Sequence, residues 1–268
     1  MRGAETTTLT SAAGLADEVS VVVIAPQAAI GPFATAYVTD ANVWYASVAQ
    51  MASVMISFGE LPPLVVVGVG YPIGSLFNDD DARAEWGASR QRDLFAVTHD
   101  DVAPERRASG LSAPGGVGAG DFLAFLTEEV APFVERSHPA HLTDRALVGA
   151  SVGADFALYA LLARPGAFQR VVAISPGVWP QLYDDLAVDW ADSAAATGTD
   201  LFIAGGSLEE NRRAVGDLMI ERLQSIAPGK LRVSAHTFEN ETHASVWPAA
   251  YSRGLRTVYA SGDSPAAS

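Results

Sequence analysis

The sequence predicts an α/β domain with three layers, in which helices cover both faces of a mostly parallel sheet. Short apolar runs of strand length alternate along the chain with segments of helix length. The 268 residues, of which 49% are hydrophobic, can bury one substantial core and suit a single domain that spans residues 1–268. Neither an internal repeat nor a linker divides the chain.

The individual elements are predicted from hydrophobic period and from the turn residues between runs. Strands are expected at residues 19–25, 35–38, 64–70, 146–149, 170–174, 201–204 and 231–238. Helices are expected at residues 43–58, 120–136, 152–162, 208–226 and 244–259. Because no helix separates the first two strands, we expect these two to pair antiparallel at an edge of the sheet.

Two stretches between these elements, residues 72–119 and 175–199, are predicted to be long loops. Both follow central strands, and open α/β sheets bind ligands at the carboxyl ends of their strands. We therefore expect both loops to form walls of a substrate site. The end segments, residues 1–18 and 261–268, are expected to be poorly ordered.

Composition excludes several classes of function. Lysine and arginine number 17 against 31 acidic residues, and the formal net charge of −14 repels phosphate backbones and anionic lipid. We expect no nucleic-acid partner and no membrane span, because the longest apolar runs are far shorter than the roughly 20 residues that cross a bilayer. The absence of cysteine excludes disulfides, thiolate metal sites and a cysteine nucleophile. No cofactor or metal is expected, and residues 1–18 lack a secretion-signal pattern, which favours a cytoplasmic protein.

The run Gly149-Ala150-Ser151-Val152-Gly153 places a serine between two glycines, with a strand-like run before it and a helix-like run after it. This pattern is typical of a nucleophile elbow, a sharp turn from strand to helix that exposes the serine hydroxyl above the sheet. The turn brings neighbouring groups so close that a Cβ at either glycine would collide with them. Ser151 is therefore the predicted nucleophile.

A serine hydroxyl needs a base that takes its proton, and the chain has five histidines. His243 follows the last predicted strand and precedes the last helix, so we expect it in a loop at the carboxyl end of a strand. His236 lies inside that strand, where packing or solvent is its expected surrounding. The remaining histidines precede Ser151 in loops or at helix ends: His99, His138 and His141. We predict that His243 is the base.

A third group must orient the base. Glu209, just after the strand at residues 201–204, is the predicted acid, and its neighbour Glu210 is an alternative. Weaker candidates lie in the loop of residues 175–199: Asp184, Asp185 and Asp189. Both glutamates can instead be ordinary acids in the first turn of a helix, which would leave a Ser-His dyad. The order serine, acid, histidine along the chain is that of the α/β-hydrolases.

The oxygen that becomes negative in such a reaction needs backbone N–H donors. One donor is expected to be the N–H of Val152, directly after the nucleophile. The other is expected in the loop after an early strand, at Asn42. Asp40 or Asn42 can also cap the helix predicted to begin at residue 43, and the two roles can coexist.

Several motifs together carry a resemblance to a known family over about residues 21–259. They are Tyr37-Val38-Thr39-Asp40-Ala41-Asn42, Glu60-Leu61-Pro62-Pro63, Val66-Val67-Gly68-Val69-Gly70-Tyr71-Pro72, Arg92-Asp93, the run around Ser151, and Ile174-Ser175-Pro176. In these the chain resembles the esterase D-like group of the α/β-hydrolases, particularly its siderophore esterases of the enterobactin and bacillibactin type. The resemblance implies the α/β-hydrolase fold, with Ser151 as nucleophile, His243 as base and Glu209 as acid.

The chain departs from this pattern at three positions. The family commonly has glycine where Ala41 and Ala154 stand, and an apolar residue where Asp155 stands. These changes are expected to narrow or polarise the floor of the pocket. Asp155, Trp179 and Arg92 are the predicted contacts to substrate.

The resemblance and the motifs favour a serine esterase that acts on a small-molecule ester through an acyl-enzyme intermediate. Acyl transfer or lactone formation by the same intermediate is an alternative, since mycolyltransferases resemble this group. A non-catalytic binding protein on the same fold is a second alternative, suggested by Ala154 and Asp155. The sequence leaves the substrate and the oligomeric state open.

Overall fold

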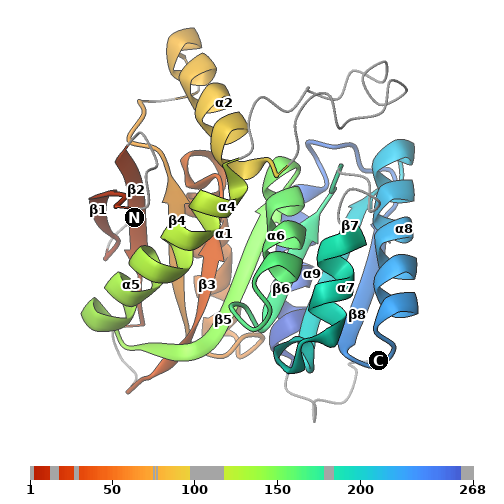
Figure 1. Cartoon of the computed structure of the whole chain (residues 1–268). Helices are drawn as coiled ribbons and strands as arrows, with labels where there is room; N and C mark the ends of the chain where they lie inside the picture. Colours follow the sequence, from red (N-terminus) through yellow and green to blue (C-terminus); the bar gives the residue numbers. More distant parts are fainter. Residues whose placement is uncertain are drawn as a thin grey trace.

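A computed structural model describes residues 3–12, 18–26, 30–74, 76, 78–96, 118–177 and 184–260. Within these residues an eight-stranded sheet lies between two layers of helices (Figure 1), in the strand order β1-β2-β4-β3-β5-β6-β7-β8. The strands are β1 (Glu5–Thr10), β2 (Glu18–Ile24), β3 (Phe33–Val38), β4 (Leu64–Gly70), β5 (Ala140–Ala150), β6 (Arg170–Ile174), β7 (Thr199–Gly206) and β8 (Leu231–Phe238). The predicted three-layer α/β fold with a mostly parallel sheet is confirmed.

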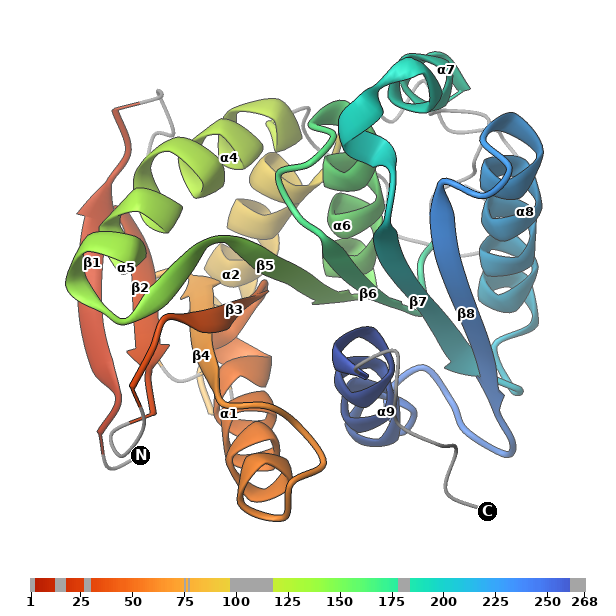
Figure 2. The ribbon, with the colours of Figure 1, turned by 90° about the horizontal axis from the view of Figure 1, so that it is seen from below.

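Helices cover both faces of the sheet. Figure 2 shows α1 (Ala41–Ser57) and α9 (Trp247–Tyr259) on one face. The other face carries α4 (Ala119–Phe125), α5 (Ala131–Ser137), α6 (Val152–Ala163), α7 (Asp184–Asp192) and α8 (Glu210–Ile226). A π-helical turn, η1 (Leu126–Val130), joins α4 to α5, and a 3₁₀ turn, η3 (Ala194–Ala196), precedes β7. In Figure 1, α2 (Asp80–Leu94) stands beyond the ends of the strands.

Strand β4 shows how the two cores form. All its residues are buried, and alternate side chains point to opposite faces of a sheet. Val65 belongs to the apolar cluster that includes Phe156 of α6, whereas Val66 belongs to the cluster that includes Val48 of α1. Because both faces are covered, an apolar residue is favoured at nearly every position, and full burial of one valine side chain contributes roughly 1.5–3 kcal/mol.

The parallel register aligns the carboxyl ends of the central strands. Ala150 of β5 pairs with Ile174 of β6, which pairs with Ala204 of β7, which in turn pairs with His236 of β8. The loops that leave these strands therefore start side by side at one edge of the sheet. This edge is where open α/β sheets bind ligands.

The prediction that the strands at residues 19–25 and 35–38 pair with each other is wrong. Strand β2 is antiparallel, as expected, but it pairs with β4 and β1 and not with β3. Strand β3 instead lies between β4 and β5, parallel to both. The physical reason is burial: β2 alternates between buried and partly exposed residues, which suits a position near the edge, whereas Ala36 and Val38 of β3 are fully buried.

Two other predictions about order and loops differ from the structure. Residues 1–18 were expected to be poorly ordered, but residues 5–10 form β1, an exposed edge strand.

The predicted long loops contain α2 and α7. Helix α2 has no apolar stripe, because the side chains that it buries include Ser89 and Asp93. Its one clear signal is Asp79, whose side chain caps the helix by accepting the N–H of Ala82 at 3.0 Å. The prediction for residues 261–268 lies outside the described residues.

Candidate active site

Ser151 occupies the sharp turn between β5 and α6. Its backbone has φ 57° and ψ −121°, a conformation that non-glycine residues rarely adopt and that costs of order 1–3 kcal/mol. The Ser151 N–H donates to the carbonyl of Ile174 at 2.8 Å, which ties the turn to the neighbouring strand. The side chain stands at the amino end of α6 and is partly exposed.

Both glycines of the turn are sterically required. A Cβ on Gly149 would lie 2.1 Å from the carbonyl oxygen of Gly153, and a Cβ on Gly153 would lie 2.4 Å from Oγ1 of Thr39. The first contact is with helix backbone and the second with a buried, β-branched side chain. The turn therefore requires glycine on both sides of the serine, as the sequence pattern predicts.

His243 and Glu209 extend from this serine in a line of hydrogen bonds. Nε2 of His243, in the loop between β8 and α9, lies 3.1 Å from Oγ of Ser151. Nδ1 of the same ring lies 2.5 Å from Oε1 of Glu209, the residue just before α8. The three side chains singled out in the sequence thus meet at the carboxyl edge of the sheet, although 92 positions separate Ser151 from His243.

The Glu209 carboxylate is buried and fully engaged. The residue is 8% exposed, and its Oε2 accepts the hydroxyl of Ser175 at 2.7 Å and the N–H of Gly206 at 2.8 Å. Burial alone would raise the pKa of Glu209, but the hydrogen bonds from His243, Gly206 and Ser175 outweigh it and hold the pKa below its ordinary value. The carboxylate is therefore ionised near neutral pH and can only accept hydrogen bonds. The alternative acid, Glu210, is exposed.

The charge state of Glu209 assigns the tautomer of His243. Because the carboxylate only accepts, Nδ1 must carry the proton of a neutral imidazole. Nε2 then offers its lone pair to the Ser151 hydroxyl. This arrangement is the one that general-base activation of a serine requires.

Residues 39–42, which form the loop after β3 and the first two residues of α1, lie against the nucleophile turn, as the close approach of Thr39 to Gly153 shows. The side chain of Asn42 is bound at both ends to the backbone of Tyr71, with Nδ2 donating to the carbonyl at 2.7 Å and Oδ1 accepting the N–H at 2.8 Å. Only its backbone N–H can therefore serve as the predicted donor. That N–H and the N–H of Val152 both lie in first turns of helices, where backbone donors have no acceptor within the helix.

Asp155, which the sequence suggests as a contact to substrate, is buried in the first turn of α6. It is 3% exposed, and its Oδ1 accepts the N–H of Gly177 at 2.6 Å. The carboxylate therefore anchors the loop after β6 to the first turn of the nucleophile helix. Asp155 is a buried structural acceptor, because the backbone N–H of Gly177 needs a partner once the loop is buried.

The other two predicted substrate contacts have different outcomes. Arg92, at the end of α2, has a side chain that is 35% exposed and is paired through Nε with Oδ1 of the buried Asp93 at 2.6 Å. Its guanidinium is thus held in place, and its contact with substrate stays a prediction. Trp179 lies outside the described residues.

Ala41 and Ala154, which stand where the family commonly has glycine, both pack against other parts of the fold. A Cβ on Gly70 of β4 would lie 3.2 Å from the Cβ of Ala41, and a Cβ on Gly68 would lie 2.9 Å from it. The methyl group of Ala41 therefore packs against two glycines of β4. Ala154 is fully buried in the core beneath α6. Neither methyl group is placed to narrow a pocket in the way that the sequence suggests.

Sequence reasoning missed an aromatic contact beside the histidine. The rings of His243 and Trp247 meet edge to face with centroids 5.1 Å apart, and Trp247 in turn meets Trp44 at 4.1 Å. Trp44 lies in the first turn of α1 and Trp247 in the first turn of α9. The tryptophan pair thus joins the helix that follows the loop of residues 39–42 to the helix that follows the histidine. No spacing in the sequence links these two residues.

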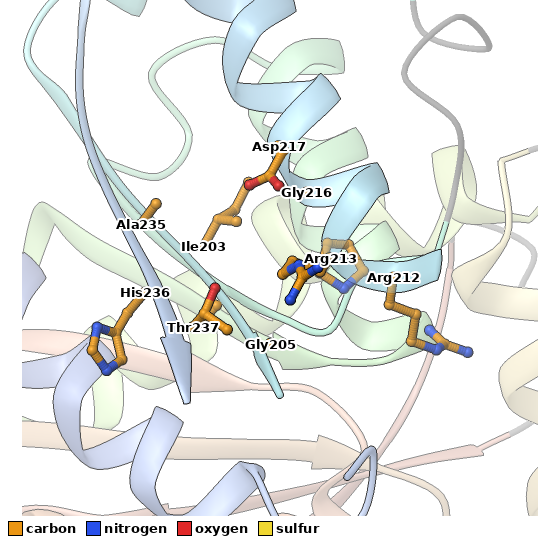
Figure 3. Close-up of a pocket in the computed structure, with 11 residues that line it drawn as sticks. Ile203, Gly205, Arg212, Arg213, Gly216, Asp217, Ala235, His236 and Thr237 are labelled. Atoms are coloured by element: carbon orange, nitrogen blue, oxygen red, sulfur yellow. The ribbon is translucent and has the colours of Figure 1, made fainter. Parts of the chain in front are cut away.

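Ser175 and Arg212 were also missed, and both belong to the acid end of the site. Ser175 is fully buried, has φ 52°, and accepts a hydrogen bond from Nη1 of Arg212 on its carbonyl at 2.9 Å. Figure 3 shows Arg212 on α8 beside a cavity of about 20 Å³ that Gly205 and Thr237 also line. This volume holds about one water molecule, so the cavity is too small to be a substrate site.

Two of the other histidines, His236 and His141, have partners away from Ser151. In Figure 3, His236 points away from α8, and its ring packs against Phe238 with centroids 4.4 Å apart. His141 is exposed and its Nδ1 accepts the N–H of Thr143 at 3.2 Å. His99 lies outside the described residues.

No group of three or more histidine, aspartate or glutamate side chains in the described part of the chain is arranged to hold a metal ion. None of the helices described is long and apolar enough to cross a membrane.

Residues 96–246 match the model of the family described as Putative esterase. The ferri-bacillibactin esterase BesA of Bacillus subtilis (strain 168) is 28% identical over 234 residues, which cover 82% of this chain and 76% of that protein. A siderophore enterobactin esterase of Emericella nidulans is 33% identical over 147 residues, or 54% of this chain and 42% of that one.

Solved structures are similar over nearly the whole chain. The BES protein from Bacillus cereus has a TM-score of 0.78 at 25% identity, covering 96% of this chain and 95% of that one. The siderophore hydrolase EstA from Aspergillus nidulans has a TM-score of 0.75 at 23% identity, covering 95% and 93%. At 23% identity, the similarity to EstA shows a shared fold.

Proposed function

Because the chain belongs to the Putative esterase family and is a carboxylic ester hydrolase, we propose that Ser151, His243 and Glu209 carry out the hydrolysis through an acyl-enzyme. The observation that supports this most is the line of hydrogen bonds from Ser151 Oγ through the His243 ring to Glu209, at 3.1 and 2.5 Å. A nucleophile, a base and an orienting acid within hydrogen-bond reach are what serine catalysis requires.

In the first half of the proposed reaction, Ser151 Oγ attacks the ester carbonyl carbon and its proton passes to His243 Nε2. The carbonyl oxygen becomes negative and is stabilised by the N–H groups of Val152 and Asn42. The C–O bond to the alcohol then breaks, and His243 Nε2 gives its proton to the leaving oxygen. Glu209 remains ionised throughout and stabilises the imidazolium that forms in between.

In the second half, a water molecule attacks the acyl-enzyme while His243 Nε2 takes one of its protons. The bond to Ser151 Oγ breaks, the proton returns to that oxygen, and the carboxylic acid leaves. The balance is one water consumed for one acid and one alcohol released. The half-exposed imidazole, whose side chain is 37% exposed, lets water reach this position.

The experiment that tests the nucleophile combines turnover and labelling. Wild-type protein should hydrolyse a short-chain p-nitrophenyl ester and react with a fluorophosphonate on Ser151, as located by peptide mass spectrometry. The Ser151→Ala variant should lose both activities, whereas Ser57→Ala, which changes an exposed serine at the end of α1, should retain both. Turnover that survives in Ser151→Ala would falsify the proposed nucleophile.

The substrate class that the relatives suggest is a siderophore ester, since the relatives named above are esterases of bacillibactin and enterobactin. We propose this class for the present chain as well. Incubation of bacillibactin and enterobactin, with and without iron, followed by chromatography should show loss of the ester and release of acid with wild-type protein. The same profile with the Ser151→Ala variant would show that the loss of ester does not depend on Ser151.

A further inference from the structure

The carboxylate of Asp40 lies within residues 39–42, but it does not cap the helix α1 that begins there. Asp40 lies at the cap position of α1 with φ 54°, yet its side chain makes no capping hydrogen bond. The residue is 3% exposed. A buried carboxylate must be paired to remain ionised in such a place, so its partner is the relevant feature.

That partner is Arg90 of α2. Its Nε donates to Oδ1 of Asp40 at 2.9 Å and its Nη2 donates to Oδ2 at 2.7 Å. The Arg90 side chain is 15% exposed, and its guanidinium lies over the ring of Trp86 at 4.5 Å from the centroid. This is the two-point contact that a planar guanidinium makes with a carboxylate and that a lysine ammonium cannot reproduce.

The paired carboxylate also touches the nucleophile turn. A Cβ on Gly153 would lie 3.3 Å from Oδ2 of Asp40 and 2.4 Å from Oγ1 of Thr39, so no side chain separates the loop from the start of α6. The position of Asp40 against this turn therefore sets the distance between two groups of backbone donors. One group is the first turn of α6, with Val152, and the other is the first turn of α1, with Asn42.

The charges of Arg90 and Asp40 favour their pairing. Burial alone would lower the pKa of Arg90, but Asp40 outweighs it and raises the pKa above its ordinary value, with a smaller contribution from Asp155. The guanidinium is thus charged, and the carboxylates of Asp40 and of Asp155 on the nucleophile helix both favour that charge. Removing it would leave the Asp40 carboxylate buried without its partner, which is strongly destabilising.

We propose that Arg90 is a positioning residue for ester hydrolysis, because through Asp40 it holds the N–H donors of residues 41–42 at the spacing from the Val152 N–H that a tetrahedral intermediate requires. This inference rests on the proposed function. It gives α2, which follows β4 and lies outside the sheet, a role in the reaction that does not depend on contact with substrate.

The first test is the Arg90→Lys variant, which retains the charge but loses the two-point contact. We expect kcat to fall about 10- to 100-fold, because donors displaced by a fraction of an ångström stabilise the oxyanion less. KM should stay within about threefold, because the donors act in the transition state and not in ground-state binding. Fluorophosphonate labelling would locate the same serine.

A matched control separates positioning from stability. Arg145 pairs with Glu135 through Nε at 2.8 Å, with side chains 16% and 9% exposed. Arg145 lies on β5, six residues before Ser151, and at the rise of a strand this spacing is about 20 Å. Arg145→Lys should lower the thermal midpoint as much as Arg90→Lys does, yet leave kcat unchanged within about twofold. Equal losses of kcat in the two variants would overturn the proposal.

A second readout follows the oxyanion itself. A trifluoromethyl ketone with the same acyl chain as the ester forms a tetrahedral adduct on the serine, and its inhibition constant should rise in Arg90→Lys by the factor by which kcat/KM falls. An unchanged inhibition constant would overturn the proposal. If the lysine variant does not fold, Asp40→Asn, which removes one of the two guanidinium contacts, provides the same comparison.

These outcomes are distinct from failure of the proposed function. Activity that persists in Ser151→Ala would contradict the nucleophile, whatever Arg90 does. Activity that depends on Ser151 but is unaffected in Arg90→Lys would contradict only the role of Arg90.

Discussion

Replacing Glu209 by glutamine removes the negative charge at the far end of the hydrogen-bonded line while preserving side-chain volume. At the position of Oε2 the new amide meets Ser175 and the N–H of Gly206, both placed to donate, and at the position of Oε1 it meets only His243. The amide oxygen therefore takes the first position, and the NH₂ group faces the imidazole. Nδ1 of His243 must then accept, and its proton moves to Nε2.

The changed tautomer places an N–H opposite the Ser151 hydroxyl, so His243 can no longer take the serine proton. Loss of the orienting carboxylate in comparable serine enzymes lowers kcat about 10⁴-fold. This corresponds to about 5.5 kcal/mol in the activation free energy. Because both hydrogen bonds at the Oε2 position remain, we expect the thermal midpoint to change little.

The assay is kcat and KM on a short p-nitrophenyl ester, with thermal midpoints measured in parallel. Glu210→Gln is the matched control, since Glu210 is the adjacent, exposed glutamate, and it should retain wild-type kcat. The reasoning is refuted if Glu209→Gln stays within about threefold of wild type. A large loss in Glu210→Gln alone would move the acid to that residue.

Three further predictions concern the neighbours of this line. Gly149→Ala should destabilise the fold by about 1–3 kcal/mol, because its Cβ would lie 2.1 Å from a backbone oxygen, whereas Gly87→Ala, with nothing within 4 Å, should not. Asp155→Ala should cost about 1–3 kcal/mol in urea unfolding, because it leaves a buried loop N–H unpaired, and Asp155→Asn should cost less. Ser175→Ala should raise the pKa of Glu209 toward its ordinary value. The lowered pKa in the folded state contributes stability above the unfolded value of about 4.3 that is lost as pH falls through the folded value, so the variant should lose its stability at higher pH than wild type.

Each of these predictions has a contrary outcome. Equal thermal midpoints for the two glycine variants would contradict the steric account of the turn. Equal unfolding free energies for the alanine and asparagine variants at Asp155 would show that its acceptor oxygen is not what stabilises the loop. Superimposable curves of stability against pH for wild type and Ser175→Ala would show that the serine hydroxyl does not affect the Glu209 pKa.

Local patterns predicted much of the fold. The bounds of β4 and β6 follow directly from their apolar runs, because a strand that is covered on both faces of the sheet is apolar on both faces. Strand β8 lies at the edge of the sheet and was predicted from its alternation of apolar and polar residues. Helix α2 was missed because the side that it buries carries Asp93 and Ser89 in place of an apolar stripe. The exposed β1 was missed because it has almost no apolar pattern.

The candidate site was predictable where residues follow strands directly. Ser151, Glu209 and His243 each come within a few residues of a strand end, and parallel strands bring such ends to one edge. The hydrogen bond between Asp155 and Gly177 was not predicted, because the position of Asp155 near the nucleophile suggests contact with substrate and gives no sign that the loop after β6 lies over it.

The sequence by itself determined seven of the strands and the strand ends that carry the serine, the acid and the histidine, because these depend on hydrophobic period and on turn residues within short windows. Only the tertiary structure decided that β4 lies between β2 and β3, that Ser175 supports the acid across 34 positions, and that Arg90 reaches Asp40 across 50. Contacts of this kind form between surfaces that meet only after the core has assembled. Their energies depend on burial and two-point geometry, and neither quantity is written in a local run of residues.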